Sequence, residues 1–176
     1  MISDVVALPI FDRVFIFLNT VYFMGVHQVN VRAFFKRLSD AQIDENTNIM
    51  LFYCGMCSCI SLPLIGVFDC VKFLPIHYIF ASLFFVSAGT YTFTLAKIMK
   101  DNKERFPIQD EQAIDSNYKF SYVMLALITL LILSTVILGD KYWVTPLLEW
   151  ITVFCHMNYF SVLNFTNPFH NSIHPY

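Results

Sequence analysis

Five apolar stretches, each long enough to cross a membrane, dominate the chain and constrain what it can fold into. They are Val14–Val31, Thr47–Phe68, Phe73–Ala96, Phe120–Leu138 and a run that begins at Tyr142. A helix needs about 20 apolar residues to cross the hydrocarbon core of a bilayer, and membrane β-strands would instead show short alternating segments. The pattern predicts an all-α, polytopic membrane bundle of five transmembrane helices.

Composition also indicates that the chain is surrounded by membrane lipid rather than by water. Of the 176 residues, 57% are hydrophobic and only 14% are charged, which is too few charges to cover a water-soluble domain. The net charge of −2 provides no basic surface, so nucleic acid is not an expected partner. We expect a single transmembrane domain over residues 1–176.

The cations predict how the bundle is oriented. Eight of the eleven flank the first and third connections between spans: Arg32, Lys36, Arg37, Lys97, Lys100, Lys103, Arg105 and Lys119. The other three lie on the opposite side: Arg13, Lys72 and Lys141. Because positive charge concentrates in cytoplasmic connections, the N-terminus is expected outside and the C-terminus inside.

Two spans carry an ionisable side chain just after a proline that is expected to begin the helix. His77 follows Pro75 by two residues, and Glu149 follows Pro146 by three, which places the carboxylate about 4.5 Å into the helix. Both side chains therefore reach the outer interface. Three further polar residues are expected on that side: Asp69, Ser3 and Asp4. The prediction is an outer polar cluster that forms ion pairs or contacts lipid headgroups.

Catalysis at this cluster is the less favoured alternative. A carboxylate beside an imidazole can support acid–base chemistry, but hydrolysis also needs a nucleophile or a metal-bound water. Ser3 is a conceivable nucleophile at the N-terminus. We expect the protein not to be an enzyme.

His156 lies ten residues after Pro146, about 15 Å along the helix axis and near the bilayer centre. We expect this imidazole to be neutral and hydrogen-bonded to a Ser, Thr, Asn or Tyr across the bundle. His27 is expected near the inner end of the first span, so no second histidine would share a metal ion with His156. The cysteines of "YCGMCSC" are expected to pack helices closely. No metal or cofactor is expected.

Three segments resemble one known family: "ISD" at Ile2–Asp4, "IHYIFASLFFVSAGTYT" in the third span and "LLEWITVF" in the last. The family includes the damage-regulated autophagy modulators, the GPI-lipid-remodelling (post-GPI-attachment) proteins and the fungal suppressor of phosphatidylinositol 4-kinase defects. The resemblance implies that His77 begins one family motif and that Glu149 and Trp150 form a Glu-Trp pair opening the last span.

The resemblance also implies six spans, the first of which precedes the "ISD" segment, whereas here Met1 directly precedes that segment. The expectation is a family bundle without its first helix, whose exposed face contacts partner subunits or phospholipid. We therefore predict a non-catalytic accessory subunit that binds other integral membrane subunits. By analogy, the specific expectation is a respiratory-chain-type complex of the mitochondrial inner membrane.

The alternative is a stand-alone lipid-handling factor of the endoplasmic reticulum, Golgi or lysosome. The resemblance implies roles in GPI-anchor lipid remodelling and in phosphoinositide or autophagy regulation.

Overall fold

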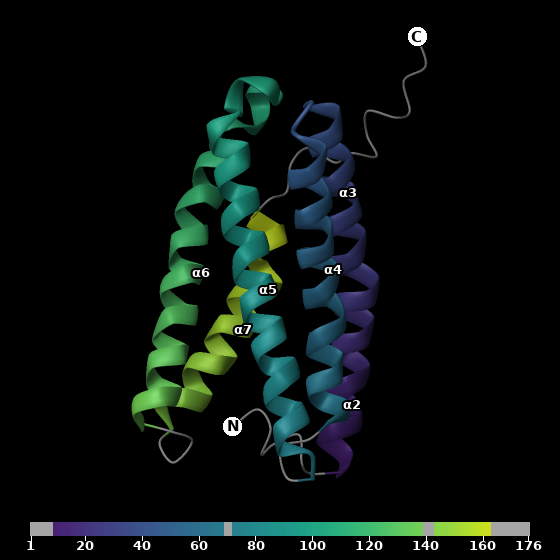
Figure 1. Cartoon of the computed structure of the whole chain (residues 1–176), viewed down its shortest axis with the longest axis vertical. Helices are drawn as coiled ribbons and strands as arrows, with labels where there is room; N and C mark the ends of the chain where they lie inside the picture. Colours follow the sequence, from purple (N-terminus) through teal and green to yellow (C-terminus); the bar gives the residue numbers. More distant parts are fainter. Residues whose placement is uncertain (1–8, 69–71, 139–142, 163–176) are drawn as a thin grey trace.

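The computed structural model describes residues 9–68, 72–138 and 143–162, and these residues are helical with short connections (Figure 1). The helices are α2 (Pro9–Thr20), η1 (Val21–His27), α3 (Gln28–Asp40), α4 (Glu45–Val67), α5 (Leu74–Asp101), α6 (Glu111–Leu138) and α7 (Val144–Val162). Two 3₁₀ turns, η2 (Lys103–Arg105) and η3 (Ile108–Asp110), connect α5 to α6. The all-α class is confirmed for this part of the chain.

Residues 9–40 form one uninterrupted rod made of α2, η1 and α3. The middle segment, η1, is a π-helix, which is a wider turn than the α-helix and is rare outside functional sites. Phe23 and His27 are its buried residues. The predicted first span, Val14–Val31, lies within this rod.

Among the residues that the structure describes, three helices, α4, α5 and α6, are long and apolar enough to cross a membrane. The number of five spans and the orientation of the bundle stay predictions.

Two helices extend past the ends of the predicted spans. α5 continues to Asp101 and α6 begins already at Glu111, so both project beyond the apolar region. Ion pairs join the projecting turns: Lys100 Nζ lies 2.6 Å from Asp115 Oδ1, and Lys103 Nζ lies 3.0 Å from Glu111 Oε2. The connection between α5 and α6 is therefore largely helical.

Helix starts agree with the prolines only in part. Pro75 lies in the first turn of α5, as expected. Thr145, which directly precedes Pro146, does not cap the last helix, because α7 begins at Val144 and Thr145 is already helical.

The helices pack in chain order: α4 against α5, α5 against α6, and α6 against α7, while the N-terminal rod lies on α4 (Figure 1). The rod and α4 approach closely at Gly55, where a Cβ atom would lie 2.8 Å from both methyl groups of Val31 and 3.0 Å from the Tyr91 ring. Small residues allow such close approach of helices in membranes.

The bundle has two chemically distinct ends. We call the end where α3 and α5 finish the basic end, because it carries Arg37, Lys100 and Lys103. The end where α5 and α7 begin is called the pocket end, because the pocket described next lies there.

Candidate functional site

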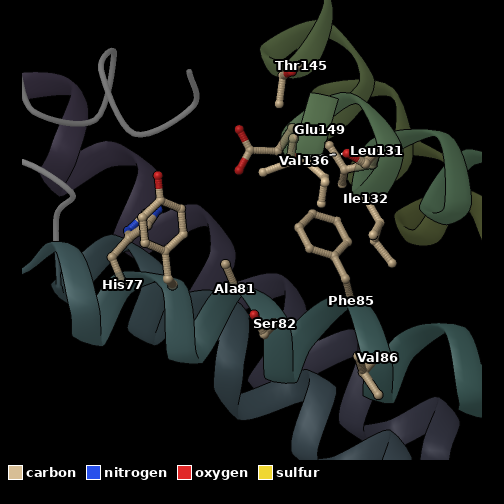
Figure 2. A pocket seen from close by; sticks show the side chains of 12 residues that line it. His77, Ala81, Ser82, Phe85, Val86, Leu131, Ile132, Val136, Thr145 and Glu149 are labelled. Atoms are coloured by element: carbon tan, nitrogen blue, oxygen red, sulfur yellow. Dashed lines mark hydrogen bonds between the residues drawn. The ribbon is translucent and has the colours of Figure 1, made fainter. Parts of the chain in front are cut away.

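A pocket of about 360 Å³ lies between α5, α6 and α7 at the pocket end (Figure 2). The lining residues come from all three helices: His77, Tyr78, Ala81, Ser82, Phe85 and Val86 of α5, Leu131, Ile132, Thr135 and Val136 of α6, and Thr145 and Glu149 of α7. His77 and Glu149, which the sequence analysis assigned to one cluster, thus line the same hollow. The other predicted members, Ser3, Asp4 and Asp69, lie outside the described residues.

His77 is held in place by the main chain. Its side chain is buried, and Nδ1 lies 2.9 Å from the carbonyl oxygen of Phe68, at the end of α4. A carbonyl oxygen can only accept a hydrogen bond, so Nδ1 carries the proton. In the neutral ring, Nε2 is then the atom with a lone pair, available to accept a hydrogen bond.

Glu149 stands across the pocket from α5. Figure 2 shows its carboxylate pointing from α7 into the space above α5, toward the side on which His77 lies. The residue is half-buried and sits in the second turn of α7. A carboxylate accepts several hydrogen bonds and attracts ammonium or hydroxyl donors.

The remainder of the pocket wall is mainly apolar. Phe85, Leu131 and Ile132 lie farther along the helices than His77 and Glu149, toward the middle of the bundle (Figure 2). The pocket therefore has a polar end near the helix starts and an apolar end toward the bundle middle, the arrangement that suits an amphipathic ligand.

A second hollow lies on the other side of α5. This α4–α5 groove has a volume of about 720 Å³ and is lined by Tyr53, Cys54 and Cys57 of α4 and by Tyr78, Ile79, Ser82, Leu83, Val86, Ser87 and Thr90 of α5. Tyr78, Ser82 and Val86 belong to the linings of both the pocket and the groove.

His156 lies deep in the bundle, as expected, but its surroundings differ from the prediction. The ring of His27 packs against it with 4.9 Å between ring centroids, so the expectation that no second histidine shares its depth is wrong. Phe23 and Phe84 complete an aromatic shell around it. The rod extends from Pro9 to Asp40, so η1 lies near its middle. His27, at the end of η1, therefore lies at the same depth in the bundle as His156.

The predicted hydrogen bond of His156 is also absent among the described residues. Neither ring nitrogen has a partner there, although the residue is only 1% exposed. The interhelical contacts that His156 does make are ring contacts with His27, Phe23 and Phe84.

Ser58, His27 and His156 follow one another in space in the order of a nucleophile, a base and a third group. His27 Nε2 lies 3.2 Å from Ser58 Oγ. However, Ser58 Oγ is fully buried and donates to the Gly55 carbonyl at 2.7 Å, inside the continuous helix α4. A nucleophile needs substrate access and an oxyanion site, and neither described hollow includes Ser58. We assign this trio a packing role.

One sequence signal would have identified this polar interior. Polar side chains recur along α7 with alternating spacings of four and three residues, the period of one face of a packed helix: Thr145, Glu149, Thr152, His156 and Tyr159. The face is buried except at the half-buried Glu149, and at its far end Tyr159 donates to the Thr92 carbonyl at 2.9 Å and accepts from Asn117. The stripe shows that α7 turns its polar face inward.

The cysteines do not form a metal centre in this part of the chain. Cys54, Cys57, Cys59 and Cys155 are free thiols. Among the described residues, no group of three or more His, Cys, Asp or Glu side chains is arranged to hold a metal ion.

Comparison with known proteins establishes the family. The model of the family described as the Frag1/DRAM/Sfk1/Cwh43P N-terminal domain matches residues 1–165, nearly the whole chain. No individual curated protein and no solved structure matches the chain. The resemblance seen in the sequence is thus confirmed, and the long apolar helices agree with it. The chain is an integral membrane protein that belongs to the Frag1/DRAM/Sfk1/Cwh43P N-terminal domain family.

Proposed function

We propose that this protein is a non-catalytic, lipid-handling protein of the endoplasmic reticulum, Golgi or lysosome. In this proposal the pocket between α5, α6 and α7 binds one lipid, with the headgroup against His77 and Glu149 and a hydrocarbon chain along Phe85 and Leu131. The observation that carries the proposal is the polarity of the pocket: its ionisable groups stand at the end of the bundle and its apolar wall lies toward the bundle middle.

The family match supports this proposal over the accessory-subunit prediction. The roles that the family resemblance implies, GPI-anchor lipid remodelling and phosphoinositide or autophagy regulation, concern lipids and endomembranes. Nothing in the fold or the family match supports a respiratory-chain complex or the mitochondrial inner membrane. Association with other integral membrane subunits remains a prediction.

Binding without chemistry is proposed because the ionisable groups of the pocket lining are a carboxylate, an imidazole and the Tyr78 phenol. These groups can orient a headgroup, but they supply neither an activated nucleophile nor a metal-bound water. A carboxylate that faces a headgroup favours lipids with an ammonium or hydroxyl donor over lipids of net negative charge.

Lipid retention by Glu149→Gln tests the proposal. We expect dioleoylphosphatidylethanolamine, added to protein in mild detergent and followed by native mass spectrometry, to bind the wild type. The variant should bind roughly ten- to hundredfold more weakly, because a hydrogen bond to a charged group contributes about 1.5–3 kcal/mol.

Glu45→Gln is the matched control, because Glu45 is an exposed acid in the first turn of α4 at the basic end. Its lipid occupancy should equal that of the wild type. Equally weakened lipid binding by both variants, or no lipid bound to the wild type, would contradict the proposal. Migration of the native protein as a fixed-stoichiometry member of a larger complex would instead favour the accessory-subunit prediction.

A further inference from the structure

We infer that the bound lipid has two hydrocarbon chains and straddles α5, with one chain in the pocket and the other in the α4–α5 groove. The inference rests on the proposed function and specifies the class of lipid that the site takes. Three observations carry it: a shared ridge, a matching depth and the position of the polar end.

The ridge separates the two hollows along the outward face of α5. Tyr78, Ser82 and Val86 are spaced four residues apart, so they lie one above another on a single helix face. The same three residues line the pocket on one side and the groove on the other. The two hollows therefore run side by side, with only the width of one helix face between them.

The length of each hollow along α5 matches the thickness of half of the hydrocarbon core of a bilayer. Along α5 the pocket extends from His77 to Val86, nine residues or about 13.5 Å. The groove extends from Tyr78 to Thr90, twelve residues or about 18 Å. Half of a hydrocarbon core of about 30 Å is about 15 Å, so each hollow accommodates a chain that hangs from the headgroup level to the bilayer midplane.

The polar end lies where the two hollows meet the surface. His77 precedes the ridge residue Tyr78 directly, and Glu149 faces the same level from α7. A glycerol backbone at this position would place one chain on each side of Tyr78. The groove is open along exposed apolar side chains, including Ile79 and Leu83, so a chain can enter it laterally from the membrane.

Comparison of two-chain and one-chain lipids with the same headgroup tests the inference. We expect native mass spectrometry to show dioleoylphosphatidylethanolamine binding the wild type roughly five- to tenfold more tightly than lyso-oleoylphosphatidylethanolamine. Within hydrocarbon, this preference comes from packing contacts of the second chain rather than from exclusion of water.

Three substitutions on lipid-facing positions separate the two hollows. Leu83→Trp fills the groove but not the pocket. It should lower the affinity for the two-chain lipid to that for the lysolipid, and the affinity for the lysolipid should not change. Val136→Trp fills the pocket and should weaken both lipids. Val123→Trp, on an exposed position of α6 that lines neither hollow, should change neither affinity.

The outcomes distinguish failure of the inference from failure of the proposed function. If neither lipid binds the wild type, the proposed function fails and the inference fails with it. If both lipids bind equally well, or if Leu83→Trp weakens the lysolipid as much as the two-chain lipid, the straddling arrangement is wrong while a lipid pocket remains.

Discussion

Arg37 and Asp110 form an ion pair at the basic end, between α3 and η3. The Asp110 side chain is 2% exposed and the Arg37 side chain is 24% exposed. Burial raises the pKa of Asp110 above its ordinary value of 3.8, against the opposing effect of the Arg37 guanidinium. Burial likewise lowers the pKa of Arg37. In both residues the cost of removing a charge from water outweighs the attraction between the partners.

The direction of the Asp110 shift predicts a pH dependence. An acid whose pKa is higher in the folded state binds its proton more tightly there than in the unfolded state. Its contribution to stability is therefore fully present below pH 3.8 and is lost as the pH rises through the folded pKa. We expect the free energy of unfolding of the wild type to show this decrease, and Asp110→Leu with Arg37→Met to remove it.

The same pair should behave asymmetrically on substitution at neutral pH. Asp110→Leu alone leaves a half-buried guanidinium without its counter-charge and should cost about 1–3 kcal/mol, whereas the double variant should recover this loss. Glu111→Gln, at an exposed ion pair with Lys103, is the control and should cost less than about 1 kcal/mol. Thermal unfolding in detergent measures all three, and a double variant as unstable as the single one would refute the burial argument.

For single residues, the sequence predicted those parts of the site that depend on position within one helix. His77 and Glu149 lie close to the helix starts that Pro75 and Pro146 indicate, and the two residues line one pocket. The contact between His27 and His156 was not predictable in this way, because it depends on how far the N-terminal rod extends on both sides of its apolar stretch.

Among the helices, the contact of the rod with α4 offers the sharpest test of packing. Gly55→Ala should destabilise the protein by about 1–3 kcal/mol, because the new methyl group would meet the branched methyls of Val31 and the buried Tyr91 ring. Gly25→Ala is the matched control, since a Cβ atom at Gly25 meets nothing within 4 Å. Thermal unfolding that shows equal losses for both would mean that the close approach at Gly55 is not what limits the packing.

The helix boundaries were predictable where hydropathy determines them, but not where ion pairs determine them. Apolar runs indicated the membrane-facing parts of α4, α5 and α6. The extension of α5 to Asp101 and the early start of α6 at Glu111 accompany the ion pairs of Lys100 and Lys103 with Asp115 and Glu111. These extensions were not predictable from hydropathy, because the charges that stabilise them pair across two separate elements.

For the molecule as a whole, the sidedness of the two ends is the property to test. Ser116→Cys lies at the basic end and Lys72→Cys at the pocket end; both positions are exposed. In sealed microsomes of a Cys70→Ser background, we expect a membrane-impermeant maleimide to label the first variant directly and the second only after permeabilisation, because the cation-rich connections should face the cytosol. The reverse pattern would invert the orientation and place the pocket in the cytosolic leaflet.

The whole fold was predictable at the level of class, because long apolar stretches without alternation favour helices, which satisfy every backbone group within one segment. The way in which the helices pack against one another was less predictable. Along α7 the residues that face inward include Thr152 and His156 as well as Val153, so hydropathy alone could not identify the buried face of this helix.

The π-helix η1 gives the N-terminal rod a point at which its length can change. A π-type hydrogen bond spans one residue more than an α-type bond, so this turn holds a residue that an unbroken α-helix would not. Loss of one residue between Val21 and His27 would let the turn relax to an ordinary α-helix, with the rod intact. The rod can therefore lose a residue here without breaking, while such a change would alter the contact between His27 and His156.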